Sequence, residues 1–299
     1  MGTSSKEKGW LTARPLEKYS SLHELSLTGW MGLGKILPKL PIFIEFNFNL
    51  HSPFRIDPKA SLAFQTHDAY IPGSPLKCFT ITHTRWRADI SSYSTFDEFP
   101  ASLSRWHRCN YLKSEKTFKN YGCTVTVIED DWTEHVDVVY KLYCNVAKKH
   151  GDKLYDICFF REIAKRDDYK LICAWFEGEI ISMFVLEEEL PTIHSICCGM
   201  DYDHSSRCYA YSWLHYELIR FAIETKKYKN IDVGMSADNS KRGICFSPVP
   251  SHMDICAKSV ITRSFLKFIS SFVTGTITPD AKLKLKLRKL PRHLAVVKK

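Results

Sequence analysis

The second half of the sequence alternates between apolar strands and amphipathic helices, and that order constrains the fold more than any other feature. From Cys123 the pattern predicts a strand, helices at 136–149 and 159–165, a hairpin at 170–187, a strand at 192–199, a helix at 209–225 and a short buried strand at 230–234. Glu177-Gly178 is a typical hairpin turn. Strands and helices mixed in this way indicate an α+β or mixed α/β fold.

The first half contains fewer elements. Period-two alternation predicts strands at 42–48, 61–71 and 77–84. A strongly basic helix is predicted from Thr95 to Tyr121, with Thr95 and Glu98 as a capping box and Gly122 as the C-terminal cap. Its cations alternate with Trp106 and Tyr111, a combination that suits stacking on nucleic-acid bases, although a solvated helix face has the same composition.

Composition excludes several classes of protein. Hydrophobic residues make up 44% of the 299 residues, enough for a full core without disulfides. The 11 cysteines form no Cys-x-x-Cys pair, so no metal site is expected. Those in apolar runs, such as Cys158 and Cys173, are expected to be buried and reduced.

The net charge of +9 is concentrated partly after Asp280, in a basic C-terminal tail. A basic chain favours partners such as nucleic acid, acidic lipid or a phosphorylated co-substrate, but a solvated tail is equally compatible. Within the tail, Lys282–Leu287 alternates like an amphipathic strand that pairs with a sheet edge or lies on a membrane. No apolar run is long enough to cross a bilayer and the start lacks a signal-peptide core, so a cytoplasmic protein is expected.

Two segments resemble the Fem-type branch of the GNAT acyltransferases, a group that includes BioF-like acetyltransferase domains. The first runs from Phe96 to Tyr111 and continues at Tyr121-Gly-Cys-Thr-Val. The second begins at Cys198-Gly-Met-Asp-Tyr and ends with Asp232-Val-Gly and the later Lys241 and Gly243. Together they cover roughly residues 90 to 255. The resemblance implies a degenerate N-terminal lobe at 1–90, a GNAT-like lobe at 91–258, and a C-terminal helix and tail at 259–299.

The resemblance also implies an activity. Such enzymes move an acyl group from a thioester or an aminoacyl-tRNA to an amine by direct attack, and a splayed pair of strands holds the donor. We expect an N-acyltransferase with acyl-CoA as co-substrate. The alternatives are a Fem-type transferase that uses aminoacyl-tRNA and a non-catalytic GNAT-like binding module. The chain departs from ordinary GNAT enzymes at 201–209, where no glycine-rich turn precedes the helix and two aspartates would repel a phosphate.

Four residues are predicted to be catalytic. Asp232, at the end of a buried strand, would orient the amine or relay its proton, and Lys241, in the polar loop that follows, would stabilise an oxyanion or a donor phosphate. Tyr211 and His215 share a helix face and would act as acid and base. Each also has a purely structural interpretation, as an ion pair, a surface charge or a core side chain.

The remaining predicted site residues bind rather than react. Donor contacts are expected from Cys198, Gly199, Arg207, Cys208 and Tyr209, and substrate contacts from Arg108, Asn110 and Gly243. Cys208 at a predicted helix N-terminus is a rival nucleophile, because such a position lowers a thiol pKa.

Overall fold

The computed structural model describes residues 84–150, 156–234 and 238–252, the helical residues 260, 263 and 264, and the backbone of strands elsewhere. The chain forms two compact units, of which unit 1 contains residues 1–84 and 250–299 and unit 2 contains residues 85–249. The chain passes from unit 1 to unit 2 within β4 (Lys77–Asp89) and returns within β10 (Ser247–Ala257). The predicted boundaries at 90 and 258 stay predictions.

Unit 1 is described by its strands. β2 (Phe43–Asn47) pairs with β1 (Arg14–Pro15) antiparallel and with β3 (Leu62–His67) in parallel, and β3 pairs with β10 antiparallel. β11 (Val273–Ile277) and β12 (Leu283–Leu287) form an antiparallel pair, so the alternating tail segment is a strand. Most of the helix predicted after Ser259 lies outside the described residues, and the assignment of 1–90 as a GNAT-like lobe stays a prediction.

Unit 2 is built on one sheet in the order β4–β9–β8–β7–β6–β5. Its strands are β5 (Thr124–Ile128), β6 (Tyr169–Phe176), β7 (Glu179–Glu189), β8 (Thr192–Met200) and β9 (Asn230–Asp232). Neighbours are antiparallel except β8 and β9, which are parallel. A parallel pair needs a crossover connection, and the helices between Met200 and Asn230 provide it.

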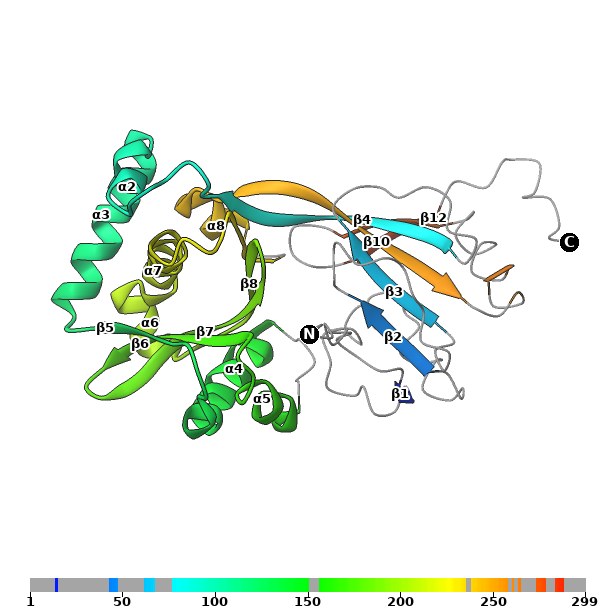
Figure 1. Cartoon of the computed structure of the whole chain (residues 1–299), viewed down its shortest axis with the longest axis horizontal. Helices are drawn as coiled ribbons and strands as arrows, with labels where there is room; N and C mark the ends of the chain where they lie inside the picture. Colours follow the sequence, from blue (N-terminus) through cyan, green and yellow to red (C-terminus); the bar gives the residue numbers. More distant parts are fainter. Residues whose placement is uncertain are drawn as a thin grey trace, which may run out of the picture. The chain divides into compact units, whose positions relative to one another are not determined.

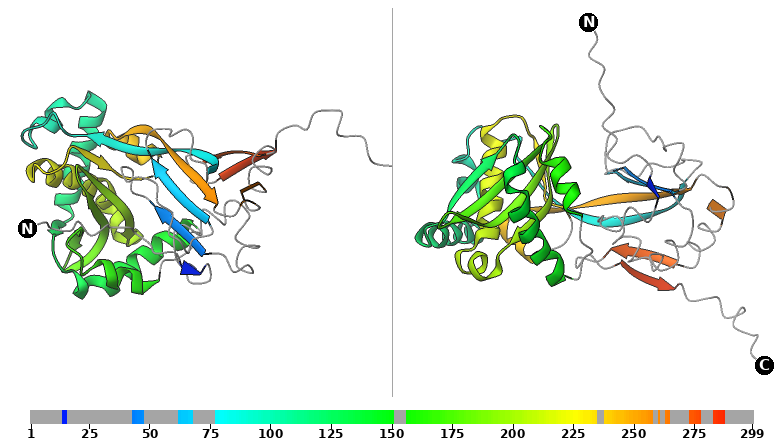
Figure 2. Two further views of the ribbon diagram at one scale, coloured as in Figure 1. Left: turned by 45° about the vertical axis from the view of Figure 1, so that its right-hand side comes forward. Right: turned by 90° about the horizontal axis from the view of Figure 1, so that it is seen from below.

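Helices cover both faces of this sheet (Figure 1). α4 (Val136–His150) and α5 (Ile157–Ile163), which follow the 3₁₀ turn Thr133–His135, lie on one face. α7 (Ala210–Glu224) packs on the other, with α3 (Arg105–Asn120) along it. Figure 2 shows α4 and α5, in green, lying together at one side of the sheet. The core between the sheet and α7 contains Phe118, Trp213 and Phe184.

The predicted basic helix is in fact two helices, α2 (Glu98–Ser102) and α3. The break comes at extended Leu103, after which the Ser104 side chain accepts the His107 N–H and caps α3. The proposed capping box at Thr95 is therefore wrong: the Glu98 carboxylate accepts the Ser94 N–H instead. Gly122 is confirmed as the C-terminal cap, with φ of +83°.

The predicted helix at 209–225 is confirmed as α7. The segment before it, expected to be a turn, is a separate short helix, α6 (Tyr202–Cys208), and Tyr209 joins the two with φ of +58°. The expected loop around Lys241 is a short helix, α8 (Asp238–Ile244). The hairpin turn is confirmed, because Glu177 and Gly178 both have positive φ.

Two predictions about cysteines have different outcomes. Cys173 is buried in β6, as expected, because it lies on a strand covered on both faces. Cys158 is exposed, which corrects the expectation. It lies in the first turn of α5, where only Phe160 and Ile163 are buried.

Candidate functional site

Strands β8 and β9 are paired over only part of their length. Thr192, Ile193 and His194 pair with Asn230, Ile231 and Asp232. From Ser195 to Met200, β8 has no strand partner on that edge among the described residues. We call the region where the strands separate, residues 195–200 and 232–234, the β8–β9 fork. Its open edge offers backbone N–H and C=O groups to an extended ligand.

A β-bulge lies where the fork opens. On the β7 side, Leu186 pairs with Ser195 and Val185 pairs with Cys197, so Ile196 is the extra residue of β8. Bulges bend a strand and interrupt its ladder, and they are common next to binding sites. The bulge gives a local reason for β8 to separate from β9 at this point.

Two predicted catalytic side chains from α7 lie at this fork. The ring centroids of Tyr211 and His215 are 4.6 Å apart. The ring centroid of Phe184, on β7, lies 5.6 Å from that of Tyr211 and 4.5 Å from that of His215. Phe184 pairs with Cys198 across the β7–β8 ladder. The helix face that carries Tyr211 and His215 therefore packs beside the open part of β8.

The contacts of His215 determine its protonation. Nδ1 lies 2.8 Å from the Tyr211 carbonyl, which only accepts hydrogen bonds, so Nδ1 carries the proton and Nε2 is an acceptor. In the described part of the chain, no group hydrogen-bonds to Nε2. Burial, the larger cause, and the positive charge of Lys241 lower the pKa of His215 to about 3. His215 is therefore neutral at physiological pH and has an available lone pair.

Lys241 is buried on α8, which corrects the expectation of a polar loop. Its ammonium donates to the Val233 carbonyl at 2.6 Å and to the Gly234 carbonyl at 3.2 Å. These are the carbonyl groups that directly follow β9, so Lys241 holds one arm of the fork in position.

Asp232 is fully buried and surrounded by donors. Arg85 donates to both carboxylate oxygens, at 2.8 and 2.9 Å, Arg87 donates at 2.7 Å, and the Gly234 N–H at 2.7 Å. Burial alone would raise the pKa of Asp232, but Arg85, His194 and Arg87 outweigh it and hold the pKa well below its usual range. A carboxylate with so low a proton affinity is poorly suited to relay a proton. These contacts favour the interpretation of Asp232 as an ion pair that anchors the end of β9.

The predicted donor-binding residues lie around α6. The Asp201 side chain accepts the Asp203 N–H, so the first turn of α6 is capped by one carboxylate and carries a second. Exposed Arg207 is in the last turn. Cys208 is the last residue of α6 and not the first of a helix, and burial raises its pKa, so the structure contradicts an activated thiol.

Two other donor-site predictions have structural explanations. Gly199 lies under α4: an added Cβ would be 2.7 Å from both the Leu142 Cβ and the Tyr143 backbone nitrogen. Exposed Tyr209 links α6 to α7, with the Lys113 ammonium 5.0 Å from its ring centroid. Gly199 is thus needed for close packing, and Tyr209 contributes a cation–π contact at the surface.

The predicted substrate-binding residues lie on α3 and α8. The Asn110 side chain donates to the Gly243 carbonyl at 3.2 Å, so these two are brought together. The Arg108 guanidinium donates to the carbonyls of Pro100, Ala101 and Leu103 at the end of α2. Arg108 thus binds α2 and not the fork.

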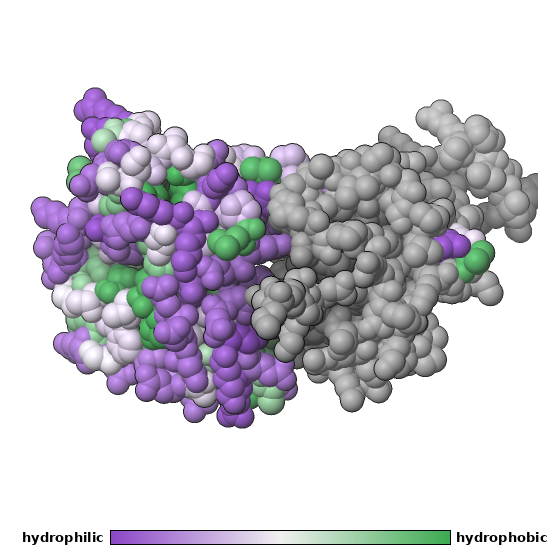
Figure 3. All heavy atoms as spheres, viewed as in Figure 1, coloured by the Kyte–Doolittle hydropathy of each residue, from purple (hydrophilic) through white to green (hydrophobic). Residues whose placement is uncertain are grey.

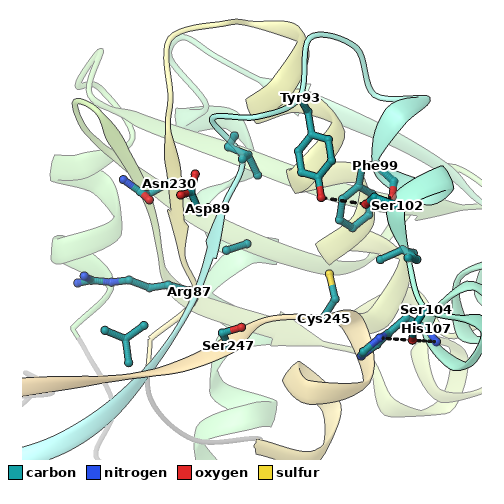
Figure 4. A pocket seen from close by; sticks show the side chains of 14 residues that line it. Arg87, Asp89, Tyr93, Phe99, Ser102, Ser104, His107, Asn230, Cys245 and Ser247 are labelled. Carbon is teal, nitrogen blue, oxygen red and sulfur yellow. Dashed lines mark hydrogen bonds between the residues drawn. The ribbon is translucent and has the colours of Figure 1, made fainter.

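A separate pocket of about 580 Å³ lies beside the end of β4. Arg87, Asp89 and Asn230 line one side of it, opposite Tyr93 and His107 (Figure 4). Two of its polar side chains already have partners: the Tyr93 hydroxyl bonds to Ser102, and the His107 ring to the Ser104 hydroxyl and the Arg242 carbonyl. None of the predicted site residues lines this pocket.

The outer side of α3 is mixed in character. Trp106 and Leu112 are 56% and 53% exposed, next to the exposed cations Arg105 and Lys116. Figure 3 shows hydrophilic and hydrophobic side chains interspersed over this part of unit 2. Tyr111 is buried against Trp213, so the expectation that it stacks on bases is wrong.

Two residues at the fork were not predicted from the sequence. Arg85 and Arg87 bind Asp232, and their i, i+2 spacing on a strand is the signal that puts both on one face. Tyr202, the first residue of α6, was not predicted either, and the Lys149 ammonium lies 3.5 Å from the centroid of its ring. Its only sequence signal is its place directly after β8.

Within the described residues, no helix is long and apolar enough to cross a membrane. The same residues include no group of three or more His, Cys, Asp or Glu side chains that could hold a metal ion.

Comparisons with known proteins identify the fold. No family model matches the sequence, and no curated protein matches it. The structure is similar to that of FemX, with a TM-score of 0.52, 12% identity, and coverage of 73% of this chain and 81% of FemX. The chain has a GNAT-like, Fem-type fold. This confirms the predicted mixed α/β class.

Two further structures have lower similarity. They are L-PGS from Bacillus licheniformis (TM-score 0.44, 9% identity, 63% of this chain and 65% of that one) and a GCN5-related N-acetyltransferase from Kribbella flavida (TM-score 0.39, 9% identity, 66% and 68%).

Proposed function

We propose that the protein transfers an acyl group from an activated donor to an amine within the β8–β9 fork. The observation that carries this proposal is the open edge of β8 from Ser195 to Met200, beside the neutral His215. An unpaired strand edge binds an extended chain through backbone hydrogen bonds, which would align the donor along β8. The GNAT-like, Fem-type fold supports the same assignment.

The reaction is direct attack. The amine nitrogen forms a bond to the acyl carbon, and the bond from that carbon to the donor oxygen or sulfur breaks. The amine proton passes to the leaving oxygen or sulfur, while the lone pair of His215 Nε2 accepts a hydrogen bond from the amine and orients it; with a pKa of about 3, His215 does not hold the proton itself. Positioning accounts for most of the rate enhancement, because an amine that is held in alignment reacts as if its concentration were very high. Lys241 keeps the fork open through the Val233 and Gly234 carbonyls and takes no part as a nucleophile.

The structure around α6 favours one donor over the other. A CoA diphosphate would meet the carboxylates of Asp201 and Asp203 at the start of α6, and the Asp203 N–H is already bonded. Two carboxylates repel a diphosphate, so acyl-CoA would need to place its phosphates elsewhere. The aminoacyl ester of a tRNA has no diphosphate, and we propose it as the donor. Acyl-CoA is the second candidate, because its amide-containing arm suits the open edge of β8.

The exposed side of α3 is compatible with a tRNA donor. Arg105 and Lys116 are exposed cations without an ion pair in the described part of the chain, and Trp106 offers an exposed ring. Cations bind phosphates and aromatic rings stack on bases.

Calorimetry and thermal shift would test the donor. The full chain is titrated with acetyl-CoA, a longer acyl-CoA, aminoacyl-tRNA and deacylated tRNA. A donor at about one hundred times its Kd adds roughly 2.7 kcal/mol to the free energy of unfolding. We expect aminoacyl-tRNA to bind with steep salt dependence and to release tRNA when amines are added. Arg105→Gln with Lys116→Gln should reduce the salt slope, while Lys148→Gln on α4, on the opposite face of the sheet, should not.

The other outcomes are decisive as well. Binding of acyl-CoA without binding of tRNA would show that acyl-CoA, and not aminoacyl-tRNA, is the donor. Donor binding without any transfer to an amine would favour a non-catalytic module. If none of these donors binds, the proposal of acyl transfer in the fork is wrong.

A further inference from the structure

The pocket beside the end of β4 has two walls of different character. Its lining residues all belong to unit 2, and its volume of about 580 Å³ is that of an ordinary small-molecule site. We call Asp89 and Asn230 the polar wall, and Tyr93 and Phe99 the aromatic wall. Figure 4 shows the two walls on opposite sides of the pocket. A ligand that fits between them has one polar end and one apolar end.

Strand pairing brings the two side chains of the polar wall together. Asp89 of β4 lies directly opposite Asn230 of β9 in the antiparallel ladder. Residues paired in this way point to the same face, with their Cβ atoms about 5 Å apart. The side-chain amide of Asn230 has no hydrogen-bond partner among the described residues. A carboxylate and an available amide oxygen therefore lie side by side, and both accept hydrogen bonds.

The charge of Asp89 is the one at the pocket that no opposite charge balances within the described residues. The Arg87 guanidinium is bound to the Asp232 carboxylate at 2.7 Å, and the His107 ring has two hydrogen bonds. Asp89 accepts hydrogen bonds only from the Ser91 hydroxyl and N–H, which lower its pKa, so it is ionised at neutral pH. The polar wall therefore attracts a cation.

The aromatic wall is held in place from both sides. The ring centroids of Tyr93 and Phe99 are 5.7 Å apart in an edge-to-face arrangement, and Phe99 is buried. The Tyr93 hydroxyl bonds to the Ser102 hydroxyl, which donates to the Phe99 carbonyl. Aromatic rings bury apolar surface, and their faces also attract cations. This wall suits the carbon chain of a cationic ligand.

Cys245 lines the pocket in a backbone conformation that few side chains adopt. It follows α8 with φ of +87°, where its N–H bonds to the Arg242 carbonyl and the Phe246 N–H to the Lys241 carbonyl. Glycine is the usual residue at such a helix end, and strained residues of this kind cluster at ligand sites. Burial raises the pKa of Cys245 to about 12, so the thiol adds no charge to that of Asp89.

We propose that this pocket binds a small primary amine in its ammonium form, with the ammonium group on the polar wall and the carbon chain on the aromatic wall. This inference goes beyond acyl transfer in the fork and does not depend on it. An ammonium group has three N–H donors, so a carboxylate oxygen and an amide oxygen accept from it together. An anion of the same size would be repelled by Asp89.

An NMR titration of the full chain tests the ligand class. The probes are n-pentylamine and n-pentanol, which have the same carbon chain but differ in charge. We expect pentylamine to shift the side-chain amide signals of Asn230 and the backbone N–H signal of Cys245. Pentanol should bind about tenfold more weakly, because it cannot form a charge-assisted hydrogen bond.

Two variants with the same loss of charge identify the group that binds. Asp89→Asn should lower the affinity for pentylamine about tenfold and leave that for pentanol unchanged. Asp130→Asn is the matched control, because Asp130 is exposed and follows β5, at the edge of the unit 2 sheet opposite β4. It should not change either affinity.

Three results would overturn the inference. Equal affinities for pentylamine and pentanol would mean that the pocket does not select a cation. An equal loss of affinity in both variants would mean that the amine senses only the net charge of the protein. Absence of shifts at Asn230 and Cys245 would mean that the amine does not enter the pocket. No donor is present in these titrations, so their outcome is separate from that of the proposed function.

Discussion

Two groups of polar side chains lie at the same fork and differ in how they are satisfied. Around Asp232, two arginines and a backbone N–H supply every hydrogen bond that the buried carboxylate needs. Around His215, by contrast, Nδ1 bonds to the Tyr211 carbonyl but Nε2 has no hydrogen-bond partner among the described residues. The first group is complete without a ligand, and the second is not.

The difference separates stability from function. A satisfied buried network fixes the backbone on which it lies, so its loss should unfold the fork. Unsatisfied donors and acceptors weaken the ligand-free protein and strengthen its complexes, so their loss should change binding while leaving the fold intact. Sequence patterns do not make this distinction, because Asp232 and His215 are both polar residues in apolar segments.

The largest effect is expected at Asp232. Asp232→Asn removes the buried carboxylate that the partly buried Arg85 and Arg87 contact, and we expect a loss of about 3–5 kcal/mol in the free energy of unfolding. Chemical denaturation measures it. Asp89→Asn is the control, since that carboxylate is exposed and its hydrogen bonds are to Ser91 within its own turn. A loss below about 1 kcal/mol in Asp232→Asn would contradict the anchoring role.

Lys241 should come next. Lys241→Met keeps the apolar length of the side chain but leaves the Val233 and Gly234 carbonyls without their donor. Two unsatisfied acceptors predict a loss of about 3 kcal/mol. Lys148→Met, an exposed position on α4, should change stability by less than about 0.5 kcal/mol. Equal stabilities of the two variants would show that Lys241 does not hold the fork.

The two predicted site glycines should respond differently. Gly199→Ala brings a Cβ to 2.5 Å from the Met183 Cε and 2.7 Å from the Tyr143 nitrogen, so we expect a loss of about 2 kcal/mol. Gly243→Ala meets nothing closer than 3.8 Å and lies in α8, where alanine is the better helix former. It should keep or raise the Tm. The opposite ranking would contradict the packing of α4 on β8.

The last prediction concerns the pH dependence of stability, which near neutral pH is small. The folded-state pKa of His215 is lowered to about 3, so the unfolded chain binds the extra proton. Its contribution is therefore complete above about pH 6.5 and is lost as the pH falls toward 3. The pKa of Asp232 is also lowered, so its contribution to the free energy of unfolding is lost only as the pH falls below about 4.

Titration of His215 by NMR in wild type and Lys241→Met would check this assignment. Removing the ammonium should raise the pKa of His215 but keep it below its usual value, because burial is the larger cause. A pKa that returns to the value of an exposed histidine would show that Lys241, and not burial, keeps His215 neutral.

The sequence predicted the element order of unit 2 well, because alternation and periodicity act locally. Gly122 and Glu177-Gly178 are confirmed for the same reason: a positive φ is a local requirement. The break at Leu103 and the short helix α6 were not predicted, because each depends on which local cap or backbone geometry is adopted, and the residue pattern alone does not decide that.

The site was predicted in part. Tyr211 and His215 could be placed together because helix periodicity puts them on one face. The partners of Asp232 could not be predicted, because Arg85 is 147 residues away in sequence and no local pattern shows which strands pair. Burial of Lys241 follows from the same non-local packing.

Amide hydrogen exchange along β8 tests the central claim most directly. The full chain is compared with and without aminoacyl-tRNA, using deacylated tRNA as the control. We predict slower exchange from Ser195 to Met200 only with the aminoacylated donor, and no change at Ile231 and Asp232, which are already paired. Protection confined to other strands, with unchanged exchange along the open edge of β8, would contradict the fork as the donor site.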